Sequence, residues 1–198
     1  MTGRDAVCID GWIAPQSVPE AVNQLVNMAA DGRMSTEVVC RRLCTSVKKL
    51  GTAVLQKTFT ENRGIGGGWV TVLTAAAAAR TRRYSLCRVC VELGAEVDQA
   101  DSDGYAPLLL ACCWSHRHVA ALLLERGADP TKQANGGGTP ADFARTAVRA
   151  PDPELADTME LAARDRPAAI QRLWGMDAEG PRNFDVDFES DSEDSDSD

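Results

Sequence analysis

Apolar residues recur with a helical period in two short segments between residues 101 and 130. Pro107 suits the first turn of a helix, where its missing N–H needs no partner, and the apolar run 108–112 follows it. A second apolar stripe covers 119–123, and Gly127 supplies a residue that readily adopts the left-handed conformation ending a helix. The pattern therefore predicts two short helices joined by a tight turn.

This stretch resembles an ankyrin repeat. In that family the first helix opens with Thr-Pro-Leu-His-x-Ala, and the second ends at a glycine followed by Ala-Asp. The stretch matches the family pattern without a gap at Gly104, Pro107, Leu108, Ala111, His116, Val119, Leu122, Leu123, Gly127, Ala128 and Asp129. Ala106 replaces the threonine and Leu109 the histidine, so we expect weaker hydrogen bonds at the start of the first helix.

Copies of the pattern lie on both sides of the central one. Downstream, Thr139-Pro140 follows Ala106-Pro107 after 33 residues, which is the family's repeat length. Upstream, a weaker copy begins near Gly68 and places Ala75 and Gly94 at repeat positions. Between these two residues this copy is three residues longer than the central one, so its helix-to-helix turn should bulge outward.

The resemblance covers about residues 68–163 and implies an all-α ankyrin-repeat solenoid of helix-turn-helix units with short hairpin loops. Apolar stripes over 18–29 and 38–50 predict an extra helical hairpin before it. We interpret this hairpin as an N-terminal cap, although an eroded ankyrin repeat or a pair of the armadillo or HEAT type fits the spacing. The expected organisation is a flexible arm (1–17), a helical cap (18–60), ankyrin repeats with C-terminal capping helices (61–175) and a disordered acidic tail (176–198).

The net charge of −8 is concentrated at the C-terminus, where the last fourteen residues hold eight acids and no base. The nearly neutral remainder disfavours a general affinity for nucleic acid, which needs a basic face. The tail cannot bury enough apolar surface to offset its ordering entropy, so we expect it to be disordered. Ser190 and Ser195 precede acids at the spacing of casein kinase 2 sites, and the tail is either solubilising or regulatory.

Several residue groups could carry chemistry, and we expect none of them to do so. Cys87-x-x-Cys90 and the group Cys112, Cys113, His116 and His118 offer zinc ligands. The repeat register, however, places Cys87, Cys90 and Cys112 on helices, where a buried thiol packs as a small apolar group. The glycines of 64–68 lack the Lys-Ser or Lys-Thr of a phosphate loop. With no nucleophile motif either, we expect a non-enzymatic chain without cofactor, metal or small-molecule substrate.

The N-terminus lacks the apolar run of a signal peptide, and the number of cysteines, seven, is odd. We therefore expect reduced thiols and a cytoplasmic or nuclear location. The longest apolar run, 70–79, is too short to span a bilayer, which needs about twenty residues. We expect no membrane contact and a monomer by itself.

The resemblance implies that hairpin tips and the exposed sides of the first helices bind a protein partner. The residues predicted there are Trp69, Asp101, Asp103, Tyr105, Trp114, Lys132 and Gln133. Trp69 and Tyr105 are expected at the same repeat position, side by side. The hypothesis is an interaction scaffold or adaptor. The alternatives are a regulatory or chaperone-like factor that holds a basic, histone-type client through the acidic tail, and a substrate adaptor of a ubiquitin ligase.

Overall fold

The computed structural model describes residues 12, 14–30, 34–56, 59–61, 68–79, 84–148 and 150–176. Most of the predicted arm and nearly all of the acidic tail, with Ser190 and Ser195, lie outside these residues. The described helices are α1 (Val18–Ala30), α2 (Thr36–Leu50), α3 (Ala53–Gln56), α4 (Val72–Ala78), α5 (Tyr84–Glu92), α6 (Pro107–Cys113), α7 (Arg117–Glu125), α8 (Pro140–Arg145), α9 (Pro153–Ala162) and α10 (Arg166–Met176).

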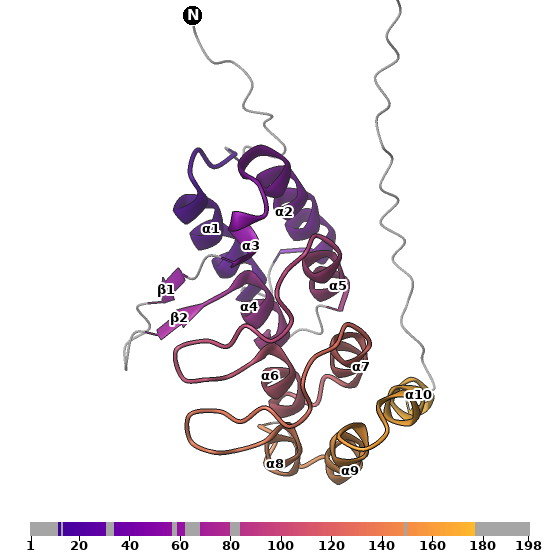
Figure 1. Cartoon of the computed structure of the whole chain (residues 1–198). Coiled ribbons are helices and arrows are strands. Elements are labelled where there is room, and N and C mark those ends of the chain that lie inside the picture. Colours follow the sequence, from indigo (N-terminus) through magenta and orange to yellow (C-terminus); the bar gives the residue numbers. More distant parts are fainter. Residues whose placement is uncertain are drawn as a thin grey trace, which may run out of the picture.

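Most of the helices form two parallel rows, as Figure 1 shows. In the inner row α1 packs on α4, α4 on α6, and α6 on α8. In the outer row α2 packs on α5 and α5 on α7. Each inner helix also contacts its outer partner, so four helix pairs stack along one axis. The all-α solenoid predicted from the sequence is confirmed, and the N-terminal pair stacks in the same rows as the repeats.

Threonine caps start two of the inner helices. Thr71 and Thr74 form a reciprocal capping box at α4, with the backbone N–H of Thr74 donating to Thr71 Oγ1 over 3.1 Å. Thr139 and Asp142 form the same motif at α8. Ala106 precedes α6 without any side-chain cap, which confirms the weakness expected from the sequence. Such caps satisfy N–H groups that the first helical turn leaves without partners.

The caps also correct the register of the upstream copy. Thr71 precedes Gly94 by 23 residues, whereas Ala106 precedes Gly127 by 21. The copy is therefore two residues longer than the central one, not three. Ala76, which is fully buried, takes the place of Ala111, and Ala75 retains 8% exposure. The sequence pattern missed this because Thr71-Val72-Leu73-Thr74 lacks the proline of the family motif.

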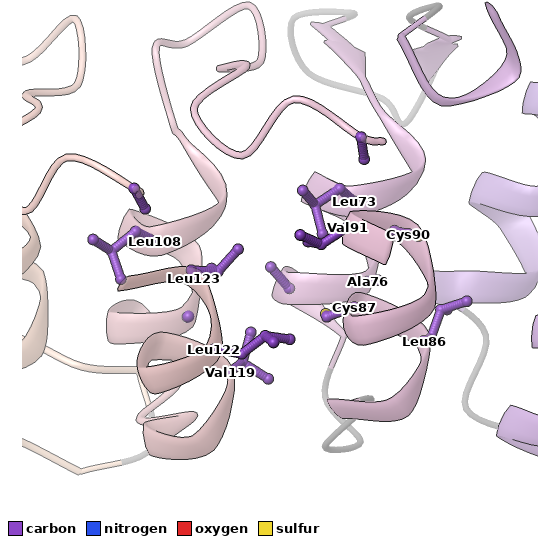
Figure 2. Close-up of a cluster of buried hydrophobic side chains, with 14 of the residues drawn as sticks. Leu73, Ala76, Leu86, Cys87, Cys90, Val91, Leu108, Val119, Leu122 and Leu123 are labelled. Carbon is purple, nitrogen blue, oxygen red and sulfur yellow. The ribbon is translucent and has the colours of Figure 1, made fainter. Parts of the chain in front are cut away.

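A buried apolar core lies between the two rows. Figure 2 shows part of it, where Leu108 and Leu123 of the central pair face Leu73 and Cys87 of the preceding one. Cys87, Cys90 and Cys112 are fully buried, as the packing interpretation predicted. Burial raises the pKa of Cys90 and of Cys112 well above the ordinary thiol value. Both thiols therefore stay protonated, in keeping with an apolar packing role.

A short insertion separates the first two helix pairs. Helix α3 is followed by β1 (Phe59–Glu61) and β2 (Gly68–Val70), which pair antiparallel with Thr60 opposite Trp69. In the described part of the chain these two strands are the only β-sheet. The side chain of Gln99 ties the next loop to this insertion, because its Nε2 donates to the carbonyl oxygen of Gln56 over 2.9 Å.

At the C-terminal end the outer row gains an additional helix. Helix α10 packs on both α7 and α9, and its Ala169 and Leu173 are fully buried. Trp174 lies in an aromatic group with Tyr84 and His118, and its Nε1 donates to Glu125 Oε1 over 2.7 Å. Helix α10 thus covers the outer side of α7, the second helix of the central pair.

The opposite end of the stack is covered in part by Trp12. Its indole Nε1 donates to Gln24 Oε1 over 2.9 Å, and the Arg42 guanidinium lies 5.3 Å from its ring centroid. The arm therefore contacts both helices of the first pair at this point. The capping function assigned to residues 18–60 stays a prediction.

Candidate partner-binding surface

Two hairpin loops project from the inner row, one over residues 93–106 and the next over 126–139 (Figure 1). Within the first loop, the Asp101 carboxylate accepts hydrogen bonds from the backbone N–H groups of Asp103 and Tyr105, over 3.0 and 2.8 Å. Partial burial raises the pKa of Asp101, while these two N–H donors act against the shift. Asp101 therefore shapes its own loop.

Further hydrogen bonds join the two loops to each other. Asn135 donates its backbone N–H to the Asp103 carbonyl over 3.1 Å and its Nδ2 to the Ser102 carbonyl over 3.0 Å. The Asp98 carboxylate accepts the backbone N–H of Asp129 over 3.1 Å, and Lys132 Nζ donates to the Asp98 carbonyl. The loops form a connected strip, which lowers the conformational entropy lost on binding.

Gly104 allows the loops to come this close. Its φ is +81°, a conformation that residues with a Cβ rarely adopt. A Cβ at this position would also lie 2.6 Å from the backbone nitrogen of Asn135. Gly104, which matches the family pattern, is thus required both by its backbone conformation and by the lack of space for a side chain.

Five of the seven predicted partner-binding residues lie on the two loops. Asp103 and Gln133 are exposed on the loops, whereas Asp101 and Lys132 are engaged in loop hydrogen bonds. Tyr105 is half-buried and packs edge to face on Phe143 with ring centroids 5.5 Å apart. These five residues lie on the strip, and their role in binding stays a prediction.

The two tryptophans of the prediction lie elsewhere. Trp114 follows the last residue of α6, at the opposite end of this helix from Tyr105. Trp69 lies on β2, and the cap register pairs Val70, not Trp69, with the position of Tyr105. The expected match of Trp69 with Tyr105 is wrong, because the first helix of the upstream copy begins one residue later than the matches at Gly68 and Ala75 imply.

The exposed side of α6 adds Leu110, which is not among the predicted surface residues. Leu110 and Cys113 are partly exposed and lie three residues apart, on one side of the helix. The other five residues of α6 are buried. Beside them, Phe143 of α8 is half-buried, and α4 presents the small side chain of Ala78. A search for the partly apolar side of α6 by helical period would have found Leu110.

In the ranges that the structure describes, no group of three or more histidines, cysteines, aspartates or glutamates could hold a metal ion. Among the helices that the structure describes, none is long and apolar enough to cross a membrane.

Comparison with known proteins agrees with the stacking of helix pairs. A family described as "Ankyrin repeats (3 copies)" matches residues 19–134, more than half of the chain. The match begins within α1 and ends before α8, so it includes the N-terminal pair and favours its interpretation as an eroded repeat. It stops short of the copy at Thr139-Pro140.

A mouse protein (Mus musculus), protein phosphatase 1 regulatory subunit 27, is 31% identical over 74 residues. The aligned part is 37% of this chain and 44% of the relative, so the chain spans less than half of that protein's length. Ankyrin repeats are protein-interaction modules, and the stacked pairs described above are such a module. Pattern, stacking and family match agree that this chain belongs to the ankyrin repeat family.

Proposed function

We propose that this chain is a non-catalytic adaptor that binds a protein partner across its hairpin loops and the adjoining side of α6. The observation that carries the proposal is the hydrogen-bonded strip formed by the two loops, with Asn135 joined to Ser102 and Asp103. A surface that is already ordered loses little entropy when a partner binds. The same strip exposes Asp103 and Gln133, whose side chains are accessible to a partner.

Site-specific photo-crosslinking tests this proposal. A photoreactive amino acid is placed at Asp103 or Gln133 in the full chain, and at Asp157 or Arg172 as controls. The controls are exposed on α9 and α10, away from the loops. We expect partner crosslinks from the loop positions only. Equal yields from both sets, or crosslinks from the control positions alone, would contradict binding at the loops.

Regulation of a protein phosphatase is a second candidate, favoured by the similarity to the mouse regulatory subunit. The ankyrin module would then hold the phosphatase catalytic subunit or one of its substrates. A direct binding assay with purified protein phosphatase 1 catalytic subunit tests the idea, together with its rate of dephosphorylation in the presence of this chain. No binding and no change in rate would exclude direct regulation.

The acidic tail carries another alternative, a basic client of histone type. Eight carboxylates in fourteen residues provide the charge for such binding. If the tail is the binding segment, replacing its acids by amides abolishes binding of a histone probe while loop substitutions leave it unchanged. The reverse result assigns binding to the ankyrin module.

A further inference from the structure

The exposed side of α6 presents a short apolar strip that continues from the middle of the helix to its C-terminal end, away from the hairpin loops. It consists of Leu110, Cys113 and Trp114, all partly exposed, and we call it the α6 strip. The described packing neighbours of α6 are α4, α7 and α8, and these cover the rest of the helix. Partly exposed leucine and tryptophan at helical spacing provide contact area for one large apolar side chain of a partner.

The loop edge at the N-terminal end of α6 carries negative charge. The loop over 93–106 holds four acids, Glu96, Asp98, Asp101 and Asp103, and no lysine or arginine. Asp129 lies beside it, since its backbone N–H donates to the Asp98 carboxylate. Lys132 and Arg166 are bases near this edge: the ammonium group of Lys132 is directed to the Asp98 carbonyl, and the positive charge of Arg166 acts on Asp129. Backbone hydrogen bonds position these carboxylates without cancelling their charge, so the edge stays acidic.

Hydrogen bonding separates these acids into fixed and available groups. The carboxylates of Asp98, Asp101 and Asp129 accept backbone N–H groups and are held in place. Hydrogen bonds from Thr131 lower the pKa of Asp129, which keeps it ionised. The side chains of Glu96 and Asp103 are exposed, and the described hydrogen bonds of both residues use only their backbones. Two free carboxylates thus stand on a fixed acidic edge.

We infer that the occupant of this surface is a short basic segment of a partner protein, with Lys or Arg side chains on the acidic loop edge and one large apolar side chain on the α6 strip. The inference rests on the proposed function and names its partner class. Opposite charges speed the association of a basic segment with this surface and fix its position along it, whereas an acidic segment would be repelled. Residues 185–198 of this chain are acidic and would therefore be a poor occupant.

Selection from a library of short random peptides by the full-length protein tests the inference. Three charge variants are compared with the unmodified chain, each with acids replaced by amides: a loop variant (Glu96→Gln with Asp103→Asn), an outer-row control (Asp157→Asn) and a tail control (Asp194→Asn with Asp196→Asn). A fourth variant, Leu110→Ala, tests the α6 strip. All retain the described hydrogen bonds of the loops.

We expect enrichment of peptides that combine Lys or Arg with a large apolar residue. Their affinity should fall about fivefold in the loop variant, as for the loss of two exposed charge pairs, and stay unchanged in both controls. It should also fall as salt rises, because screening shortens the range of these contacts. Leu110→Ala should lower the affinity of the same peptides.

Several results would overturn the inference. Enriched peptides without basic residues would do so, as would basic peptides that lose affinity in the tail control and not in the loop variant. Failure to enrich any peptide would also count against it, because a short linear segment is what the inference requires. If non-basic peptides bind and lose affinity in Leu110→Ala, the proposed function stands and the basic partner class falls. If neither the loop variant nor Leu110→Ala changes binding, both fall.

Discussion

In the central repeat, formed by α6 and α7, neither helix begins with a side-chain cap, since Ala106 and His116 precede them. In the repeats on either side, Thr71 caps α4, Thr139 caps α8 and Asp152 caps α9. The repeat that best matches the family pattern therefore lacks the side-chain caps that begin helices in its neighbours.

Contacts with neighbouring repeats replace the missing caps. His116 is 2% exposed, and its Nδ1 lies 3.2 Å from the Ala77 carbonyl oxygen, to which it donates. Arg117 donates two hydrogen bonds to the Asp152 carboxylate, over 3.0 and 2.9 Å. The loop before α6 is held by Asn135. The central repeat thus depends on long-range contacts, and its neighbours more on local ones, as expected where repeats stabilise one another.

The largest effect is expected at the contact between α7 and α9. Asp152→Ala removes both hydrogen bonds of Arg117 to this mostly buried carboxylate and the cap of α9. We expect the free energy of unfolding to fall by about 3 kcal/mol, measured by urea denaturation. Glu154→Ala is the control, because Glu154 also pairs with Arg117 but is exposed. A loss there above about 0.5 kcal/mol would contradict the assignment.

The same carboxylate makes stability depend on pH. Burial of Asp152 acts to raise its pKa, but hydrogen bonds from Arg117 and the Leu155 N–H outweigh it, and the folded-state pKa is lowered. The contribution is therefore fully present above the unfolded value, about 3.9, and is lost as the pH falls through the folded-state value. Unfolding followed from pH 7 into the acid range should show a smaller decline for Asp152→Asn. Parallel curves would exclude Asp152 as a source.

Gly104 tests the loop contact that supports the start of α6. Gly104→Ala combines the unfavourable left-handed conformation with a clash against Asn135, and we expect a loss of about 2 kcal/mol. Gly136→Ala is the matched control, since its φ is not in that region and nothing lies within 4 Å of an added Cβ. Thermal unfolding of the two variants measures the difference. Equal melting temperatures would show that the loops can separate freely.

Removal of a local cap should have a moderate effect. Thr139→Ala breaks the capping box at α8, and we expect a loss of about 1 kcal/mol in chemical denaturation. Thr139→Ser keeps the oxygen and should lose little. If the two variants are equally destabilised, the methyl group of Thr139 and not its hydroxyl is responsible.

The smallest effect should come from adding a cap to the central repeat. Ala106→Ser supplies an oxygen at the position that Thr71 and Thr139 fill in the neighbouring repeats. We expect a gain of about 0.5 kcal/mol. Ala106→Cys adds an atom at the same place without a good acceptor and should give no gain. A loss in the serine variant would mean that the buried site lacks room for the oxygen.

The repeat pattern predicted the helices better than the contacts between them. Pro107 and Gly127 located α6 and α7 almost to the residue, because both act through local backbone conformation. The upstream copy was placed one residue too early, because its first helix begins at Val72 and not at a proline. The hairpin of β1 and β2 was not predicted, since its short strands lie among glycines that indicate only a loop.

The candidate surface was predictable in position and not in detail. Family resemblance placed Asp103, Tyr105 and Gln133 on the loops, where the structure has them. The engagement of Lys132 was not foreseeable, because Lys132 bonds Asp98 across 34 residues and only the folded stack brings them together. Asp101, by contrast, accepts from N–H groups only two and four residues away. Leu110 was overlooked because it lies within a run of leucines whose burial differs with helical phase.

The four tryptophans lie in four different segments of the chain, and Trp174 also contacts the central repeat through Glu125. Trp12 lies against the first pair, Trp69 is in the inserted hairpin, Trp114 follows α6 and Trp174 is on the last helix. Sections of a repeat stack contact only their neighbours and can unfold separately. Variants that retain one indole each would therefore give this chain intrinsic fluorescent reporters, from which the order in which its sections melt can be read directly.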